Sequence, residues 1–193
     1  MFIICYGPHK SGSTLCFQLV SALLEARGHP QDNLPPGVVE SGRSQNFGMR
    51  AQGRDRDWLY KLAAHARDPR LIAIKSHGAC NTTLGKLIDC GQVAAVVNIR
   101  DPRDILLALR DAGRKHTSGA FSAIDGAGDA LERVQRGVAI TAGWLRSSAL
   151  VADYEEIAFD TPRFLRRLAS HLNLAPPDEV LCGELYRRAA ART

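Results

Sequence analysis

Short, continuously apolar runs alternate along the chain with longer stretches in which apolar residues recur every three or four positions. The short runs predict buried strands at residues 2–5, 71–74, 93–99 and 149–152. The longer stretches predict helices at residues 13–26, 55–67, 81–90, 103–112, 129–147, 161–171 and 179–190. Strands alternating with helices indicate an α/β fold, with three α/β/α layers around a central parallel sheet.

Two polar, Gly-containing segments interrupt this pattern. Residues 29–54 and 115–128 show little periodicity and are predicted to be long loops, which are often functional in compact domains. At 193 residues, of which 45% are hydrophobic, the chain fits one domain spanning 1–193.

Polar side chains follow each predicted strand. Lys10 comes after the first, Lys75 and His77 end the second, Arg100 follows the third, and Tyr154 comes shortly after the fourth. In an open parallel sheet, ligands bind outside the carboxyl ends of the strands. The sequence therefore predicts that these five residues share one site.

The segment after the first strand, residues 6–14, reads Tyr-Gly-Pro-His-Lys-Ser-Gly-Ser-Thr. Glycines and hydroxyl residues at a strand-to-helix turn can direct several amides, and the positive end of a helix, toward a phosphate or sulfate. It is not a Walker A loop, because Lys10 precedes Gly12 by two positions instead of following the last glycine.

Composition narrows the classes of function. The net charge of +5 is mild, and no basic block is interleaved with aromatics, which argues against nucleic-acid binding. The number of cysteines, 5, is odd and none forms a Cys-x-x-Cys pair, so we expect a reduced, cytoplasmic protein. We expect no signal peptide, no membrane span and no metal site, since no long apolar run and no ligand-spaced histidines occur.

Four blocks resemble the sulfotransferases that use 3′-phosphoadenosine 5′-phosphosulfate (PAPS), in the order of that family. Residues 10–14, Lys-Ser-Gly-Ser-Thr, resemble its P-loop-like 5′-phosphosulfate loop, and residues 75–77, Lys-Ser-His, resemble its Lys-Thr-His strand end. Residues 100–104, Arg-Asp-Pro-Arg-Asp, resemble its 3′-phosphate segment. Residues 144–173 resemble its later block, in which a helical Trp precedes a strand and a Tyr-Glu turn.

The resemblance implies an enzyme that transfers a sulfuryl group from PAPS to a hydroxyl or amine of a small-molecule acceptor and releases 3′-phosphoadenosine 5′-phosphate (PAP). It implies that His77 is the general base, that Lys10 stabilises the leaving phosphate, and that Lys75 adds positive charge near the transferred group. The implied donor-binding residues are Ser11, Gly12, Ser13, Thr14, Arg100 and Tyr154.

The chain also departs from the family pattern. Ala108 stands where the family has a second 3′-phosphate ligand, Ser, and no counterpart of the C-terminal Arg-Lys-Gly segment occurs. Leu15 replaces a Trp, and His9 replaces the Pro before the lysine. The candidates to replace the C-terminal contact are Arg187, Arg188 and Arg192.

Two other functions stay open at this point. A catalytically silent nucleotide-binding protein with the same fold would account for Ala108. A nucleotide kinase would require Mg²⁺ and normally the Walker order, which is absent. The identity of the acceptor, whose pocket we expect the two long loops to wall, and the oligomeric state cannot be read from the sequence.

Overall fold

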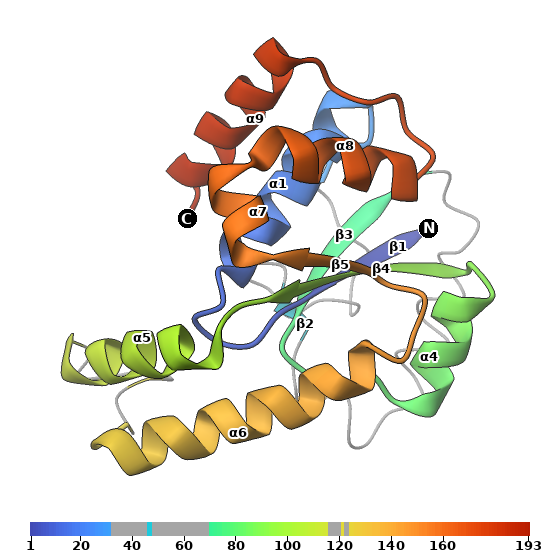
Figure 1. Cartoon of the computed structure of the whole chain (residues 1–193). Helices are drawn as coiled ribbons and strands as arrows, with labels where there is room; N and C mark the ends of the chain where they lie inside the picture. Colours follow the sequence, from blue (N-terminus) through green and yellow to red (C-terminus); the bar gives the residue numbers. More distant parts are fainter. Residues whose placement is uncertain (32–45, 48–69, 116–120, 122–123) are drawn as a thin grey trace.

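The computed structural model describes residues 1–31, 46–47, 70–115, 121 and 124–193. In this part of the chain a sheet lies at the centre, with strand order β2-β3-β1-β4-β5, and helices cover both its faces (Figure 1). Every neighbouring pair of strands is parallel. The strands are Phe2–Tyr6 (β1), Asn46–Phe47 (β2), Ile72–Ser76 (β3), Val93–Ile99 (β4) and Leu150–Asp153 (β5). The predicted α/β class with a central parallel sheet is confirmed.

The register of the strands brings their carboxyl ends to one rim. Tyr6, the last residue of β1, lies beside Ser76 of β3 and Val97 of β4. Ile99 of β4 lies beside Asp153 of β5. The residues that follow these four strands therefore start from the same edge of the sheet.

Alternate side chains of β1 enter two different cores, as a pleated strand covered on both faces requires. Ile3 and Cys5 belong to the larger core, which packs against four helices. These are α1 (Ser13–Ala26), α7 (Tyr154–Phe159), α8 (Thr161–His171) and α9 (Glu179–Ala191).

The opposite face of the sheet is covered by α4 (Thr82–Asp89) and by the end of α6 (Ala127–Trp144). Trp144 is fully buried there, and its ring stacks on that of Tyr6 at a centroid distance of 5.0 Å. Its indole N–H donates to the carbonyl of Gly78 at 2.8 Å. The helical Trp of the sequence pattern therefore anchors α6 beneath the sheet.

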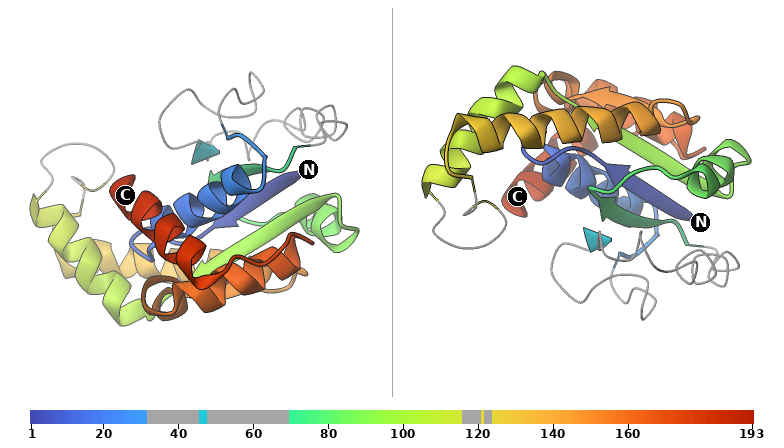
Figure 2. Two further views of the ribbon diagram at one scale, coloured as in Figure 1. Left: turned by 90° about the horizontal axis from the view of Figure 1, so that it is seen from above. Right: turned by 90° about the horizontal axis from the view of Figure 1, so that it is seen from below.

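Helix α5 (Pro102–Lys115) packs on α6, and the two extend beyond the carboxyl ends of the strands (Figures 1 and 2). Their contact forms a separate small core, made of Ile105, Leu109, Ile124, Ala130 and Val134. None of the helices in the described ranges is both long and apolar enough to cross a membrane.

The predicted elements agree with the structure at most positions. β4, α1 and α8 have the predicted bounds, and the other described elements differ by a few residues. Tyr154–Phe159 was expected to begin as a turn but forms α7, whose first turn carries Glu155 and Glu156, acidic residues that favour a helix start. The short strand β2 lies within a segment predicted to be a loop, and the predicted helix 55–67 lies outside the described residues.

Candidate active site

The loop between β1 and α1 is held from inside by Ser11. Its hydroxyl lies 2.8 Å from the carbonyl of Pro8 and 2.7 Å from the side-chain oxygen of Asn98, and its amide donates to Pro8 at 3.2 Å. The residues on either side, Lys10 and Gly12, have positive φ of 65° and 85°. Ser11 therefore fixes the bend of the loop, and its predicted contact with a phosphate stays a prediction.

Helix α1 starts directly after this bend. Its first backbone hydrogen bond runs from the amide of Cys16 to the carbonyl of Gly12 at 3.1 Å. The amides of Ser13, Thr14 and Leu15 precede that bond, so the helix does not use them as donors. Together with the helix dipole they favour an anion at this point.

Gly12 lies against the ring of Tyr154, which begins α7. A Cβ atom at position 12 would lie 2.5 Å from Cδ2 of Tyr154, closer than any real contact. The positive φ of Gly12 also disfavours other residues. Position 12 therefore requires glycine for two reasons: the backbone conformation and the lack of space for a Cβ atom.

Arg100, after β4, lies between the loop and Tyr154. Its guanidinium donates to the carbonyl of Lys10 at 3.1 Å, and its Cζ lies 4.2 Å from the centre of the Tyr154 ring. Its Nε is 3.7 Å from a carboxylate oxygen of Asp104, too far for a hydrogen bond. That Nε is buried and has no hydrogen-bond partner among the described residues, so Arg100 retains an unused donor.

Lys75 is buried at the end of β3, with 7% of its surface exposed. Its ammonium donates to the hydroxyl of Thr14 at 2.7 Å. No carboxylate of the described residues pairs with it. Burial lowers the pKa of Lys75, and the neighbouring thiols of Cys5 and Cys16 oppose this shift. A buried cation without a carboxylate partner, beside the start of a helix, strongly favours the binding of an anionic ligand.

Lys10 directs its ammonium over the ring of Phe121, 4.4 Å from its centre. Its backbone carbonyl accepts the hydrogen bond from Arg100. Lys75 and Arg100 thus contact the loop and the start of α1 from two other segments of the chain, and Lys10 belongs to the loop itself.

His77 follows β3 and lies next to the loop. Its Nδ1 is 2.6 Å from the carbonyl of Gly7, and because a carbonyl only accepts, Nδ1 carries the proton and Nε2 keeps its lone pair. Burial, with smaller contributions from His9 and Lys75, lowers the pKa of His77 to about 4, although the bond to Gly7 opposes the shift. The imidazole is therefore neutral at pH 7.

A cavity of about 620 Å³ opens beside His77. Arg100 and His9 also line it, and its remaining walls come mainly from α5 and α6. Those walls are largely apolar and include Ile99, Ile105, Leu109, Val134, Val138 and Ile140. The cavity is large enough for a small organic molecule.

The predicted site residues therefore converge on one rim. Contacts join the four strand ends through Thr14 and Lys75, through Lys10 and Arg100, and from Arg100 to Tyr154. Three further residues were missed by the sequence analysis: His9, Asn98 and Phe121. Asn98 was detectable, because a single amide stands inside the apolar run of β4.

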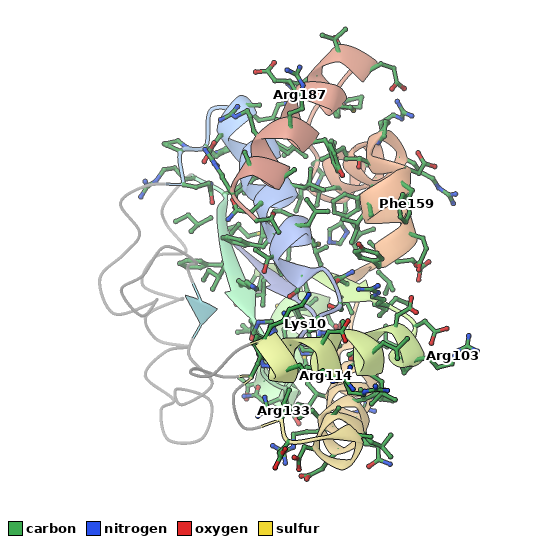
Figure 3. All side chains as sticks on the ribbon, turned by 90° about the vertical axis from the view of Figure 1, so that its left-hand side faces the viewer. Lys10, Arg103, Arg114, Arg133, Phe159 and Arg187 are labelled. Carbon is green, nitrogen blue, oxygen red and sulfur yellow. The ribbon has the colours of Figure 1, made fainter. Side chains whose placement is uncertain are left out.

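The C-terminal arginines do not reach this rim. Arg188 and Arg192 pair with Glu25, at 2.8 and 3.2 Å, near the end of α1 remote from the loop. Arg187 donates to Gly183 of its own helix at 3.3 Å and lies far from the labelled Lys10 (Figure 3). These three candidates to replace the missing C-terminal contact are therefore engaged elsewhere in this structure.

Comparison with protein-family models finds no match, and comparison with curated protein sequences finds none either. Solved structures do match. A retinol dehydratase in complex with androsterone and inactive cofactor PAP superposes with a TM-score of 0.57 at 17% identity, over 97% of this chain and 64% of that protein. Mouse sulfotransferase SULT7A1 complexed with PAP gives 0.57 at 16% identity, over 98% and 63%.

The chain has the fold of the PAP-binding sulfotransferases. A second retinol dehydratase structure, with retinol and PAP, agrees, with a TM-score of 0.55 at 18% identity over 96% of this chain and 63% of that one. The chain thus spans slightly less than two thirds of the length of these proteins. The likeness confirms the fold expected from the sequence motifs, and the activity is argued separately from the site.

Proposed function

We propose that residues 1–193 form one sulfotransferase domain, which uses PAPS as donor and a hydroxyl or amine of a small molecule as acceptor. The observation that carries the proposal is the ammonium of Lys75, buried 2.7 Å from the hydroxyl of Thr14 with no carboxylate partner among the described residues. With Lys10 and Arg100 on the same rim, positive charge lies on two sides of the loop. Such an arrangement suits a nucleotide that carries phosphates at two positions.

The residues of this rim divide between the two ends of the donor. Gly12, Ser13 and Thr14, at the start of α1, would hold the 5′-phosphate through amides and hydroxyls. Arg100 would hold the 3′-phosphate through its planar guanidinium. The predicted contact of Tyr154 with adenine stays a prediction, and its ring also supports Arg100.

PAPS would supply the sulfuryl group and leave as PAP. Nε2 of His77 would take the proton of the acceptor hydroxyl or amine as its oxygen or nitrogen bonds to sulfur, because the bond from Nδ1 to Gly7 leaves Nε2 as the basic atom. Lys10 would stabilise the negative charge that grows on the leaving phosphate oxygen, and Lys75 the charge on the transferred group.

The acceptor would enter the cavity beside His77, whose apolar walls favour a molecule with a hydrocarbon body and a single nucleophilic group. Two of the similar structures hold molecules of this kind, androsterone and retinol. The cavity of this chain, between α5 and α6, supports the same class of acceptor here.

A silent nucleotide-binding protein is the second candidate. Ala108 offers no hydroxyl to a 3′-phosphate, and Asp104 lies near Arg100 and competes for its charge. The two candidates differ at His77: removing its imidazole abolishes turnover in an enzyme and changes nothing measurable in a silent binder.

The proposal is tested by incubating the protein with PAPS, EDTA and a panel of apolar alcohols and amines. The expected result is PAP formed in step with a sulfated acceptor, without added Mg²⁺. Phosphorylated acceptors formed only with ATP and Mg²⁺ would instead identify a kinase. Binding of PAP without transfer of a sulfuryl group from PAPS to any acceptor would favour the silent protein.

A further inference from the structure

His9, the residue before the loop lysine, packs flat on His77. The two rings are stacked with centroids 4.1 Å apart and an interplanar angle of 30°. The ring of Phe121 meets His9 edge-on, with centroids 5.8 Å apart. His9 thus lies between the imidazole of His77 and an aromatic side chain, and both histidines line the cavity.

The hydrogen bond to Gly7 fixes only one atom of His77. It sets the tautomer, but a ring held at Nδ1 alone can still tilt about that bond and move Nε2 out of line. A second, flat contact removes this freedom, and the stacked ring of His9 is that contact. Misplacement of a catalytic group by about 1 Å can cost a factor of ~100 in rate, so the constraint has a functional consequence.

We propose that His9 is a positioning residue for His77: its stacked ring holds the His77 imidazole with Nε2 facing the cavity, and the two stacked rings do not both carry a positive charge. This inference rests on the proposed role of His77 as base. It concerns a residue for which the sequence resemblance implies no function, since the family has Pro at this position.

The charges around the pair disfavour a positive charge on both rings. The charged groups that face the pair or line its cavity are Lys10, Lys75, Arg100, Asp129, Glu132, Arg133 and Arg136. The carboxylate of Glu132 pairs with Arg136, and that of Asp129 accepts from the amide of residue 125. Burial lowers the pKa of His9, and the charges of Arg133, Lys75 and Lys10 lower it further.

The structural part of the proposal is tested by nitrogen-detected NMR of the histidine rings in the ligand-free protein. His9→Phe keeps an aromatic surface without a titrating group, and His9→Ala removes the surface. We expect His77 to keep its tautomer in His9→Phe and to titrate at higher pH than in the wild type. In His9→Ala the tautomer becomes mixed and the titration moves up further. His171, which lies outside this cluster, serves as internal control.

The functional part is tested by the pH dependence of kcat/KM. His9→Phe should keep the plateau to within about threefold while its acid limb moves to higher pH, whereas His9→Ala should lower the plateau about tenfold. Unchanged tautomer, titration and plateau in His9→Ala would overturn the proposal. The NMR result needs neither donor nor acceptor, so it separates a wrong role for His9 from a wrong assignment of the reaction.

Discussion

At the scale of single residues, the proposed reaction depends on a histidine that is kept neutral. Burial is the main cause of the low pKa of His77, about 4 compared with the ordinary 6.5. The base form is therefore present throughout the neutral range and is lost only in acid. We expect the acid limb of kcat/KM to lie near pH 4, not near 6.5, in a pH-rate profile of the free enzyme.

The same shift predicts how stability depends on pH. Because the folded-state pKa of His77 is depressed, the unfolded chain binds its proton first as the pH falls. The contribution of the neutral His77 side chain to the free energy of unfolding is complete above about pH 6.5 and is lost as the pH falls toward 4. In urea unfolding, His77→Asn should lose less stability across this window than the wild type loses. An identical dependence of the free energy of unfolding on pH in the two proteins would contradict the burial argument.

Replacing His77 by Asn should lower kcat by a factor of about 10² to 10⁴ while PAP affinity changes little, because in the proposed reaction the imidazole acts on the acceptor proton. Steady-state kinetics and calorimetric PAP titration measure the two quantities. His171→Asn, at the end of α8 and outside the site, is the matched control and should leave both quantities unchanged. Equal turnover of His77→Asn and wild type would remove His77 from the mechanism.

Gly12 and Gly28 provide a controlled comparison. Both have positive φ, 85° and 81°, but only Gly12 has a neighbour in the place of a Cβ, the Tyr154 ring at 2.5 Å. Gly28→Ala should lower the free energy of unfolding by roughly 1–2 kcal/mol, the strain of a left-handed backbone conformation alone. Gly12→Ala should cost more in thermal or urea unfolding and should also weaken PAP binding, because the loop or the ring must move. Equal costs would show that Tyr154 yields freely.

At the scale of elements, the junction of β3 with α1 places a cation where the fold alone does not need one. Lys75 has no described carboxylate partner, so its burial opposes folding and favours an anion. We expect Lys75→Met to leave the free energy of unfolding unchanged or higher, and to weaken PAP binding about 10- to 100-fold. Chemical unfolding and calorimetry measure the two effects.

Lys86, exposed on α4, is the matched control for that substitution. Lys86→Met should change neither quantity. If Lys75→Met instead destabilised the protein and kept full PAP affinity, Lys75 would be a structural residue.

The sequence patterns predicted the helices and strands more completely than the contacts between individual side chains. The apolar run of β4 and the apolar periodicity of α1 and α8 gave their bounds, because each buries a full face or stripe. Helix α7 was not predicted, since six residues hold too little periodicity to distinguish a helix from a turn. The burial of Lys75 also could not be predicted, because it depends on contacts across the sheet.

At the scale of the whole molecule, parallel strands explain why the meeting of the candidate site residues at one rim could be predicted from the sequence. Lys10, Lys75, Arg100 and Tyr154 are far apart in the chain, but each follows a strand that ends at the same rim. The stack of His9 on His77 could not be foreseen, because it depends on how one loop bends. Likewise, the pairing of α9 arginines with Glu25 depends on how α9 packs on α1.

The central claim is that this rim binds an adenosine nucleotide with phosphates at both the 3′ and 5′ positions. Calorimetric titration of the wild type with PAP, AMP and ATP tests it most directly, with Arg100→Gln as the variant that removes the 3′-phosphate contact. The account predicts that PAP binds at least about tenfold more tightly than AMP, and that Arg100→Gln removes this difference. A preference for ATP, or equal affinity for PAP and AMP in the wild type, would contradict it.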